Sequence, residues 1–564
     1  MGDREEQHSG RRSRRRAARL LALIGGVLHA WVPQLLVLPQ DPQGPTIGVP
    51  ATTVGLFIIG SIAVAGAVLS GRLPSIGRAL VGTAAILSVF LIVWEFRPTT
   101  WLISAPLVVA ALLPIIPVQG VAAPTTESRR EALGAIAVSG YLIWRMLRAY
   151  NDRFLPTHDE SVATKPDWEA EWLWVGGVTS TTARVSAGGL AAGRYALTYW
   201  SNDGVPEMVV ADANTNGVAR FDIDGLTPGS DYSYSVGRAI DETGLDEAAT
   251  ADANFRTPSS GAQNVTIAFG SCASTGSNGA VFDAIRATDP DLFVQLGDLH
   301  YGNLTSRHPA DHIEMLGRSI STPAQSALYS SVPSAWIWDD HDYGPNDSDS
   351  TSPARAGALG AYRQAVPHWS VASGDGAPIN QAFTIGRVRV ITSDTRSQRT
   401  AGTMLGPEQE AWLIRELVES AATQAVVVWA MPTPWNFPEV ARSDVWGGFP
   451  EERRRIANAI AAAQIDNLVM ISGDWHLSAI DDGTNTSYAD DGYPGFPLIH
   501  GAPLDRPGSR TNQPHSHGVF SNAGQFGTVE VFDDGGDVID VRLTVRLWNG
   551  DRLGELSLSM SAAA

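Results

Sequence analysis

Two short apolar runs that each stop at a glycine constrain this chain more than any other feature. Residues 265–269 and 292–296 are apolar and β-rich, and a helix-length segment at 279–288 separates them. This pattern predicts two neighbouring buried strands of a β-α-β unit. The carboxyl ends of such strands meet at one edge of a sheet, where α/β proteins usually bind ligands.

Side chains that can bind a cation follow both runs. Cys272 comes after the first run, and Asp298 and Tyr301 come after the second. Cys272 is the only cysteine among 564 residues, so it forms no internal disulfide; by itself it would be interpreted as a small buried hydrophobe. Two more apolar runs, 335–338 and 468–472, also lead into acidic turns. Together the four turns predict a metal site with more than one ion.

The motifs at these turns occur in a fixed order along the chain: Ser271-Cys272, Gly297-Asp298-x-x-Tyr301, Trp338-Asp339-Asp340-His341-Asp342, Asp394-Thr395-Arg396 and Gly473-Asp474-x-His476. Their order and approximate spacing resemble the PhoD-like alkaline phosphatases, a branch of the calcineurin-like metallophosphoesterases. The segment 405–413 resembles a helix start found in many of these enzymes. The resemblance covers roughly residues 165–560.

The resemblance implies an α/β fold for residues 262–560, namely a four-layer α/β/β/α metallophosphoesterase sandwich. Residues 538–547 alternate strictly between apolar and polar side chains, as expected of an antiparallel strand with one wet face. Before this domain, short strands and turns at 168–258 predict an all-β sandwich. Its segment 225–234 resembles the tyrosine corner of fibronectin type III domains, and we interpret the domain as a spacer.

The resemblance also implies which residues hold metal, with Asp298 as the carboxylate that bridges two ions. Cys272, Tyr301 and His476 would supply a thiolate, a phenolate and an imidazole, a set that suits iron (Fe³⁺) better than magnesium or calcium.

Oxygen ligands define the second ion of the expected site. Asp340, Asp474 and Asn346 offer oxygens, which suit calcium. No histidine lies between His368 and His476, so this ion lacks an imidazole that the wider superfamily uses. Calcium is therefore favoured over zinc, with manganese and zinc as alternatives.

Four residues would serve catalysis or substrate binding. By resemblance, His341 contacts a substrate oxygen and protonates the departing alcohol, while Asp342 orients its imidazole and raises its pKa. Arg396 would hold a phosphate oxygen through its fork of donors, and Asn346 would assist in binding substrate. A surface salt bridge is the alternative for Arg396.

The predicted function is therefore metal-dependent hydrolysis of phosphate monoesters or diesters by two-metal activation of water. The main alternative is a non-catalytic adhesion or sensing ectodomain in which the metals are structural. A multi-span transporter is less favoured, because the candidate spans contain almost no polar residues to line a pathway. A phosphate ester is the expected partner, and no specific nucleic-acid binding is expected.

The amino-terminal 150 residues differ from the rest, with 14 Arg against 7 acidic residues in a chain of net charge −19. Their apolar runs predict a transmembrane region of four to five helices at 20–38, 51–70, 79–94, 101–118 and 132–144. The last run is short and arginine-flanked, so an interfacial helix is its alternative. A polar linker at 151–167 follows.

The number of spans decides the expected location of the acidic domain. The arginine-rich amino terminus should stay in the cytoplasm. Five spans then place residues 168–564 outside the cell, and four place them inside. We expect a multi-pass protein of the cell membrane with five spans and an extracytoplasmic catalytic domain, because an anionic domain fits poorly beside an anionic cytoplasmic leaflet.

Overall fold

The computed structural model describes residues 170–562, apart from 202–203, 241–243, 245–250, 375, 441–443, 510 and 512. Two antiparallel sheets come first in this part, with the strand orders β1-β2-β5 and β4-β3-β6-β7. Their strands are β1 Trp172–Gly176, β2 Thr182–Gly188, β3 Arg194–Ser201, β4 Glu207–Asp212, β5 Ala219–Asp224, β6 Asp231–Arg238 and β7 Ala251–Arg256.

These two sheets pack against each other through apolar side chains that alternate with polar ones along the strands. In β5, Ala219, Phe221 and Ile223 are buried, and they belong to one apolar cluster with residues of both sheets. The hydroxyl of Tyr232 accepts a hydrogen bond from the backbone N–H of Thr227 at 2.9 Å. This is the contact that defines a tyrosine corner.

Two larger mixed sheets follow, with the orders β10-β9-β8-β18-β19-β20 and β11-β12-β13-β14-β16-β15-β17. The apolar runs 265–269 and 292–296 form β8 and β9, which are parallel and joined through helix α6. The strands are β8 Val265–Gly270, β9 Leu292–Leu296, β10 Ser334–Ile337, β11 Gln381–Ile385, β12 Val388–Thr392, β13 Val426–Met431, β14 Leu468–Ser472, β15 Ser478–Asp481, β16 Leu498–His500, β17 Val519–Phe520, β18 Gln525–Phe532, β19 Val538–Leu547 and β20 Arg552–Ser561.

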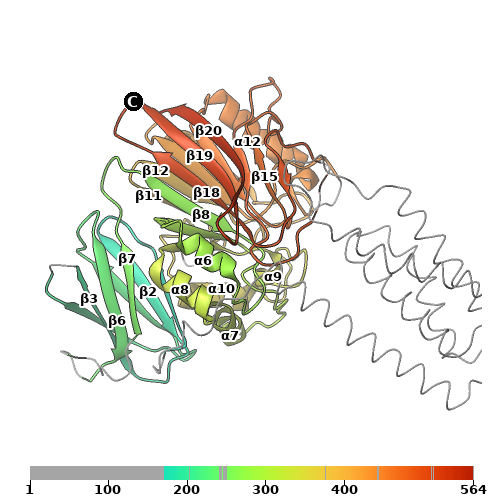
Figure 1. The fold of residues 1–564 in the computed structure, drawn as a ribbon. Helices are drawn as coiled ribbons and strands as arrows, with labels where there is room; N and C mark the ends of the chain where they lie inside the picture. The colour runs from blue at the N-terminus through green and yellow to red at the C-terminus, as the bar shows by residue number, and fades with distance from the viewer. Residues whose placement is uncertain are drawn as a thin grey trace, which may run out of the picture. The chain divides into compact units, whose positions relative to one another are not determined.

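Both faces of the seven-stranded sheet are covered. Along β13, Val426 and Val428 pack in a cluster shared with the six-stranded sheet, whereas Val427 and Trp429 pack in a second cluster with α11 and α12. The result is a sheet-rich, mixed α/β fold, as predicted (Figure 1). The helices are α6 Ala280–Arg286, α7 Pro309–Ile320, α8 Pro323–Ser331, α9 Asp340–Tyr343, α10 Arg355–Ala365, α11 Pro407–Ala421 and α12 Pro450–Ala462.

Direct contacts join the first two sheets to the larger part. The Tyr234 hydroxyl donates to the carbonyl of Ser330 at 2.7 Å. The ring of Trp174 lies edge-on to Tyr329, with centroids 5.0 Å apart. Trp174 belongs to the same apolar cluster as β8 and β9, so the β-sandwich supports the sheet that carries the predicted metal ligands.

The predicted localisation as a multi-pass membrane protein is contradicted. Among the residues that the structure describes, no helix has both the length and the apolar character needed to cross a membrane. The longest of them, α11, has 15 residues and rises about 22 Å, against a hydrocarbon core of about 30 Å. The spans expected within residues 1–150, and the linker 151–167, lie outside the described residues.

The packing of Trp172 on Gly188 gives a test of the sandwich. These residues pair across β1 and β2, and a Cβ added at Gly188 would lie 1.9 Å from Cζ2 of Trp172. We expect Gly188→Ala to lower the free energy of unfolding by about 1–3 kcal/mol through overpacking, as measured by urea unfolding. Gly261→Ala is the control, because a Cβ there meets no atom within 4 Å. Equal stability of the two variants would contradict this packing.

Candidate metal centre

The predicted ligands lie at the carboxyl ends of strands from both large sheets. Cys272, Asp298 and Asp340 follow β8, β9 and β10, which run parallel in one sheet. Asp474 follows β14 in the other sheet, and its backbone N–H donates to Ser271 Oγ at 3.0 Å. The turns after the strands therefore meet at one place.

Four of the converging residues adopt a backbone conformation that is unusual for residues other than glycine. The φ angles of Cys272, Asp298, Asp474 and His476 are 61°, 50°, 65° and 50°. A positive φ is sterically costly for most L-residues, and such strain concentrates at functional sites. The fold therefore holds strained turns at the positions whose side chains come together.

Cys272, Asp298 and His476 form the first group of donors. Each offers one ligand atom, and these atoms lie within 4.8 Å of one another. The Tyr301 hydroxyl donates to Asp298 Oδ2 at 2.8 Å and lies 2.9 Å from Nε2 of His476. All four residues expected around the first ion are thus adjacent.

A second group of donors shares Asp298 with the first. Ligand atoms of Asp298, Asp340 and His341 lie within 4.8 Å of one another, and so do those of Asp339, Asp340 and Asp474. Asp298 therefore stands between the Cys272 side and the Asp340 side, which is the geometry a bridging carboxylate needs.

Buried carboxylates dominate the electrostatics of this region. Burial raises the pKa of Asp298 well above its usual range, and the charges of Asp340 and Asp339 raise it further. Burial, followed by the charge of Asp339, does the same to the pKa of Asp474. Within the part of the chain that the structure describes, Asp298 Oδ1 and Asp339 Oδ2 are buried without a hydrogen-bond partner. A cation would satisfy these oxygens, so the residues fit a metal.

The surroundings of the Cys272 side chain also fit a bound metal. Burial, together with the nearby charges of Asp298 and Asp474, raises the pKa of its thiol well above the ordinary value. Only the thiolate is a metal ligand, so a bound cation must displace this proton.

Asp340 is the exception among the carboxylates, because its pKa is lowered. Burial alone would raise this pKa, but the positive charges of Arg396 and His341, with two backbone N–H groups, outweigh burial. Those N–H groups belong to His341 and Asp347 and lie 2.9 and 2.6 Å from the carboxylate. Asp340 is therefore held as an anionic carboxylate.

His341 has a different partner from the one expected. Its Nδ1 lies 2.6 Å from Oδ1 of Asn303. The carboxylate of Asp342 instead accepts backbone N–H groups of Asp339 at 3.0 Å and of His300 at 3.2 Å. Asp342 also completes the capping box at the start of α9, and its expected role in orienting the imidazole stays a prediction.

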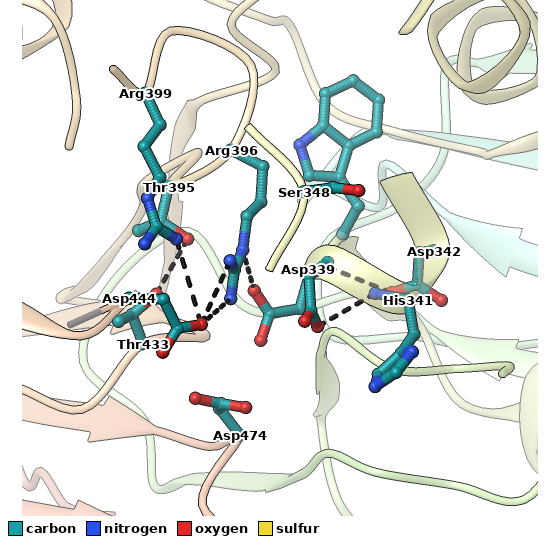
Figure 2. Close-up of polar contacts among 12 residues, drawn as sticks. Asp339, His341, Asp342, Ser348, Thr395, Arg396, Arg399, Thr433, Asp444 and Asp474 are labelled. Atoms are coloured by element: carbon teal, nitrogen blue, oxygen red, sulfur yellow. Dashed lines mark hydrogen bonds and ion pairs between the residues drawn. The ribbon is translucent and has the colours of Figure 1, made fainter. Parts of the chain in front are cut away.

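Arg396 is also placed differently from the expectation. Its side chain is fully buried, and its Nε donates to Asp339 Oδ1 while both terminal nitrogens lie 3.4–3.5 Å from Asp444 Oδ2. Figure 2 shows the guanidinium between these two carboxylates. The alternative expectation for Arg396 is a surface salt bridge. Arg396 does form ion pairs, but they lie in the interior of the site.

Asn346 is exposed and donates to its neighbour Asp347 at 2.7 Å. Its expected role in substrate binding stays a prediction. Sequence reasoning missed Asp347 and Asp444, whose ligand atoms lie within 4.8 Å of that of Asp340, and it missed Asn303. These residues lie further along the loops, beyond the turns that directly follow the strands, so no local pattern marks them.

Comparison with known proteins supports the resemblance seen in the motifs. Residues 267–523 match the PhoD-like phosphatase family. Alkaline phosphatase D of Bacillus subtilis (strain 168) is 25% identical over 315 residues, covering 46% of this chain and 53% of that protein. The chain therefore spans about half the length of this curated relative. The matching family and this relative are both phosphatases.

A solved structure also supports the fold. A structure of PhoD has a TM-score of 0.57 at 18% identity and covers 70% of this chain and 93% of that chain. A purple acid phosphatase from yellow lupin (Lupinus luteus) seeds has a TM-score of 0.47 at 12% identity, covering 69% and 74%. The first of these supports a PhoD-like fold.

Replacement of Cys272 tests the first group of donors. We expect Cys272→Ala to lower bound iron and phosphoesterase activity together, because it removes the thiol from that group. Elemental analysis of the purified protein measures the metal. Val428→Ala, a truncation of a buried residue between the sheets, should keep both. Full iron and full turnover in Cys272→Ala would leave Cys272 as a core residue only.

Proposed function

We propose that the chain is a metal-dependent phosphoesterase that hydrolyses phosphate monoesters or diesters at the centre around Asp298. One observation carries the proposal: the Asp298 carboxylate lies within 4.8 Å of ligand atoms of Cys272 and His476 and also of Asp340 and His341. A carboxylate shared by two groups of donors suits a pair of cations about 3.5–4 Å apart, as two-metal hydrolases use. The match to the PhoD-like phosphatases supports the same reaction.

The donor types suggest which ions would occupy the centre. Cys272, Tyr301 and His476 would hold iron (Fe³⁺) together with Asp298. The carboxylates of Asp340 and Asp474 would hold calcium. When bound, the two ions would supply the positive charge that neutralises phosphoryl oxygens and lowers the pKa of water.

His341 would then supply the proton that the leaving alcohol needs. Its ring lies against Tyr301, with centroids 4.3 Å apart, and its Nδ1 faces Oδ1 of Asn303. An amide oxygen can only accept, so Asn303 keeps a proton on Nδ1 and leaves Nε2 for the proton that moves to the substrate. His341 is half-buried and can reach a bound ester.

We also infer the finer fold assignment, a four-layer α/β/β/α sandwich. The apolar cluster that combines β8, β9 and β13 supports two stacked sheets. The cluster beneath α11 and α12 supports the outer helical layer of the second sheet.

The acid role of His341 can be separated from metal binding. We expect His341→Ala to retain both metals and to lose roughly 10²–10⁴-fold in rate on an alkyl phosphate ester, the usual scale for general acid catalysis. The loss should be smaller for nitrophenyl phosphate, because its phenolate leaves without a proton. Steady-state rates on the two esters, with elemental analysis, measure the difference. His517→Ala, at an exposed histidine, is the matched control.

Two other results would contradict this role. Equal losses on both esters with intact metal content would make His341 an electrostatic stabiliser of the phosphoryl oxygens. Loss of metal from His341→Ala would make it a ligand beside Asp340. Asp474→Ala should behave differently from both, because removal of a metal ligand should abolish both reactions alike.

A further inference from the structure

A second arginine lies beside the proposed metal centre. The guanidinium carbon of Arg506 lies 4.0 Å from the centroid of the Tyr301 ring. The hydroxyl of that ring contacts Asp298 and His476 at 2.8 and 2.9 Å. Tyr301 therefore contacts both the Arg506 guanidinium, through its ring, and the first group of donors, through its hydroxyl.

The turn that carries Cys272 also fixes the backbone before Arg506. The N–H of Leu504 donates to the carbonyl of Ser271 at 2.9 Å. The carboxylate of Asp505 accepts the backbone N–H of Ser274. Asp505 is buried and turned toward residues 274–277. These contacts fix the segment that carries Arg506 beside the centre.

Arg506 differs from Arg396 in whether a carboxylate pairs with its guanidinium. Among the residues that the structure describes, the Arg506 guanidinium has no hydrogen bond and no ion pair, and its Nε is buried without an acceptor. Arg396, in contrast, is fully buried between Asp339 and Asp444. A stacked guanidinium keeps its N–H groups in the plane of the fork, where they can bind oxygens at its edge.

We propose that Arg506 binds a non-bridging oxygen of the substrate phosphate, and that it does so in place of Arg396. A planar fork of donors with no carboxylate partner matches the oxygens of a phosphate group. His341 contacts the same Tyr301 ring, so the proposed acid and the proposed phosphate-binding cation adjoin one part of the site. This inference rests on the proposed function, because it assumes that a phosphate ester binds there.

Inorganic phosphate is the probe that tests the role of Arg506. Its affinity for the full-length, metal-loaded chain is measured by titration calorimetry. We expect Arg506→Gln to weaken phosphate binding by about 10–100-fold, the usual scale for a hydrogen bond to a charged group. Arg506→Lys should recover part of the affinity, because it keeps the charge but not the fork. The exposed Arg415→Gln on α11 is the control and should bind as the wild type does.

Kinetics and metal analysis complete the test. Arg506→Gln should raise KM more than it lowers kcat, as loss of ground-state binding does, and should retain the metals. Unchanged phosphate affinity in Arg506→Gln would overturn the proposal. Joint loss of metal and phosphate affinity would also overturn it, because Arg506 would then only position Tyr301. Failure of the proposed function looks different: wild-type protein would bind phosphate through Arg506 yet hydrolyse no ester.

Discussion

Burying a carboxylate beside other carboxylates raises its pKa unless a positive charge compensates, and this constraint shapes the whole centre. The pKa values of Asp298 and Asp474 are both raised, and burial is the largest cause for each. At Asp340 the positive charge of Arg396 offsets the cost of burying a carboxylate, and the pKa of Asp340 is lowered. The remaining uncompensated oxygens face a group of donors that includes the thiol of Cys272. A fold that holds such groups together in its interior is arranged to receive cations.

The close approach of the turns depends on glycine. A Cβ at Gly297 would lie 2.3 Å from Cβ of Asp339, and one at Gly473 would lie 2.3 Å from Oγ of Ser271. Gly297 also has a φ of 77°, which few other residues adopt. Gly297 lets the ends of β9 and β10 approach each other within one sheet, and Gly473 lets the end of β14 approach the end of β8 in the other sheet. The spacing of the donors around Asp298 is therefore a property of the backbone as much as of the side chains.

The two arginines near the centre illustrate how one residue type takes two roles. Arg396 is a structural counter-charge, because Asp339 and Asp444 surround it. Arg506 rests on the Tyr301 ring and keeps its donors available for an anion. The sequence motif drew attention to Arg396 because it follows a strand. Availability of the guanidinium depends on neighbouring carboxylates, and these come from distant loops.

The sequence by itself determined the strands β8 and β9, the mixed α/β fold and the gathering of Cys272, Asp298 and Tyr301, because apolar periodicity and turn chemistry are local. The same local logic predicted membrane spans, yet no described helix can cross a membrane. Only the tertiary structure decided that Asn303, 38 residues away in sequence, contacts His341, and that Asp444, 48 residues away, contacts Arg396. Such partners depend on how loops from different strands pack, and no short-range pattern in the chain encodes that packing.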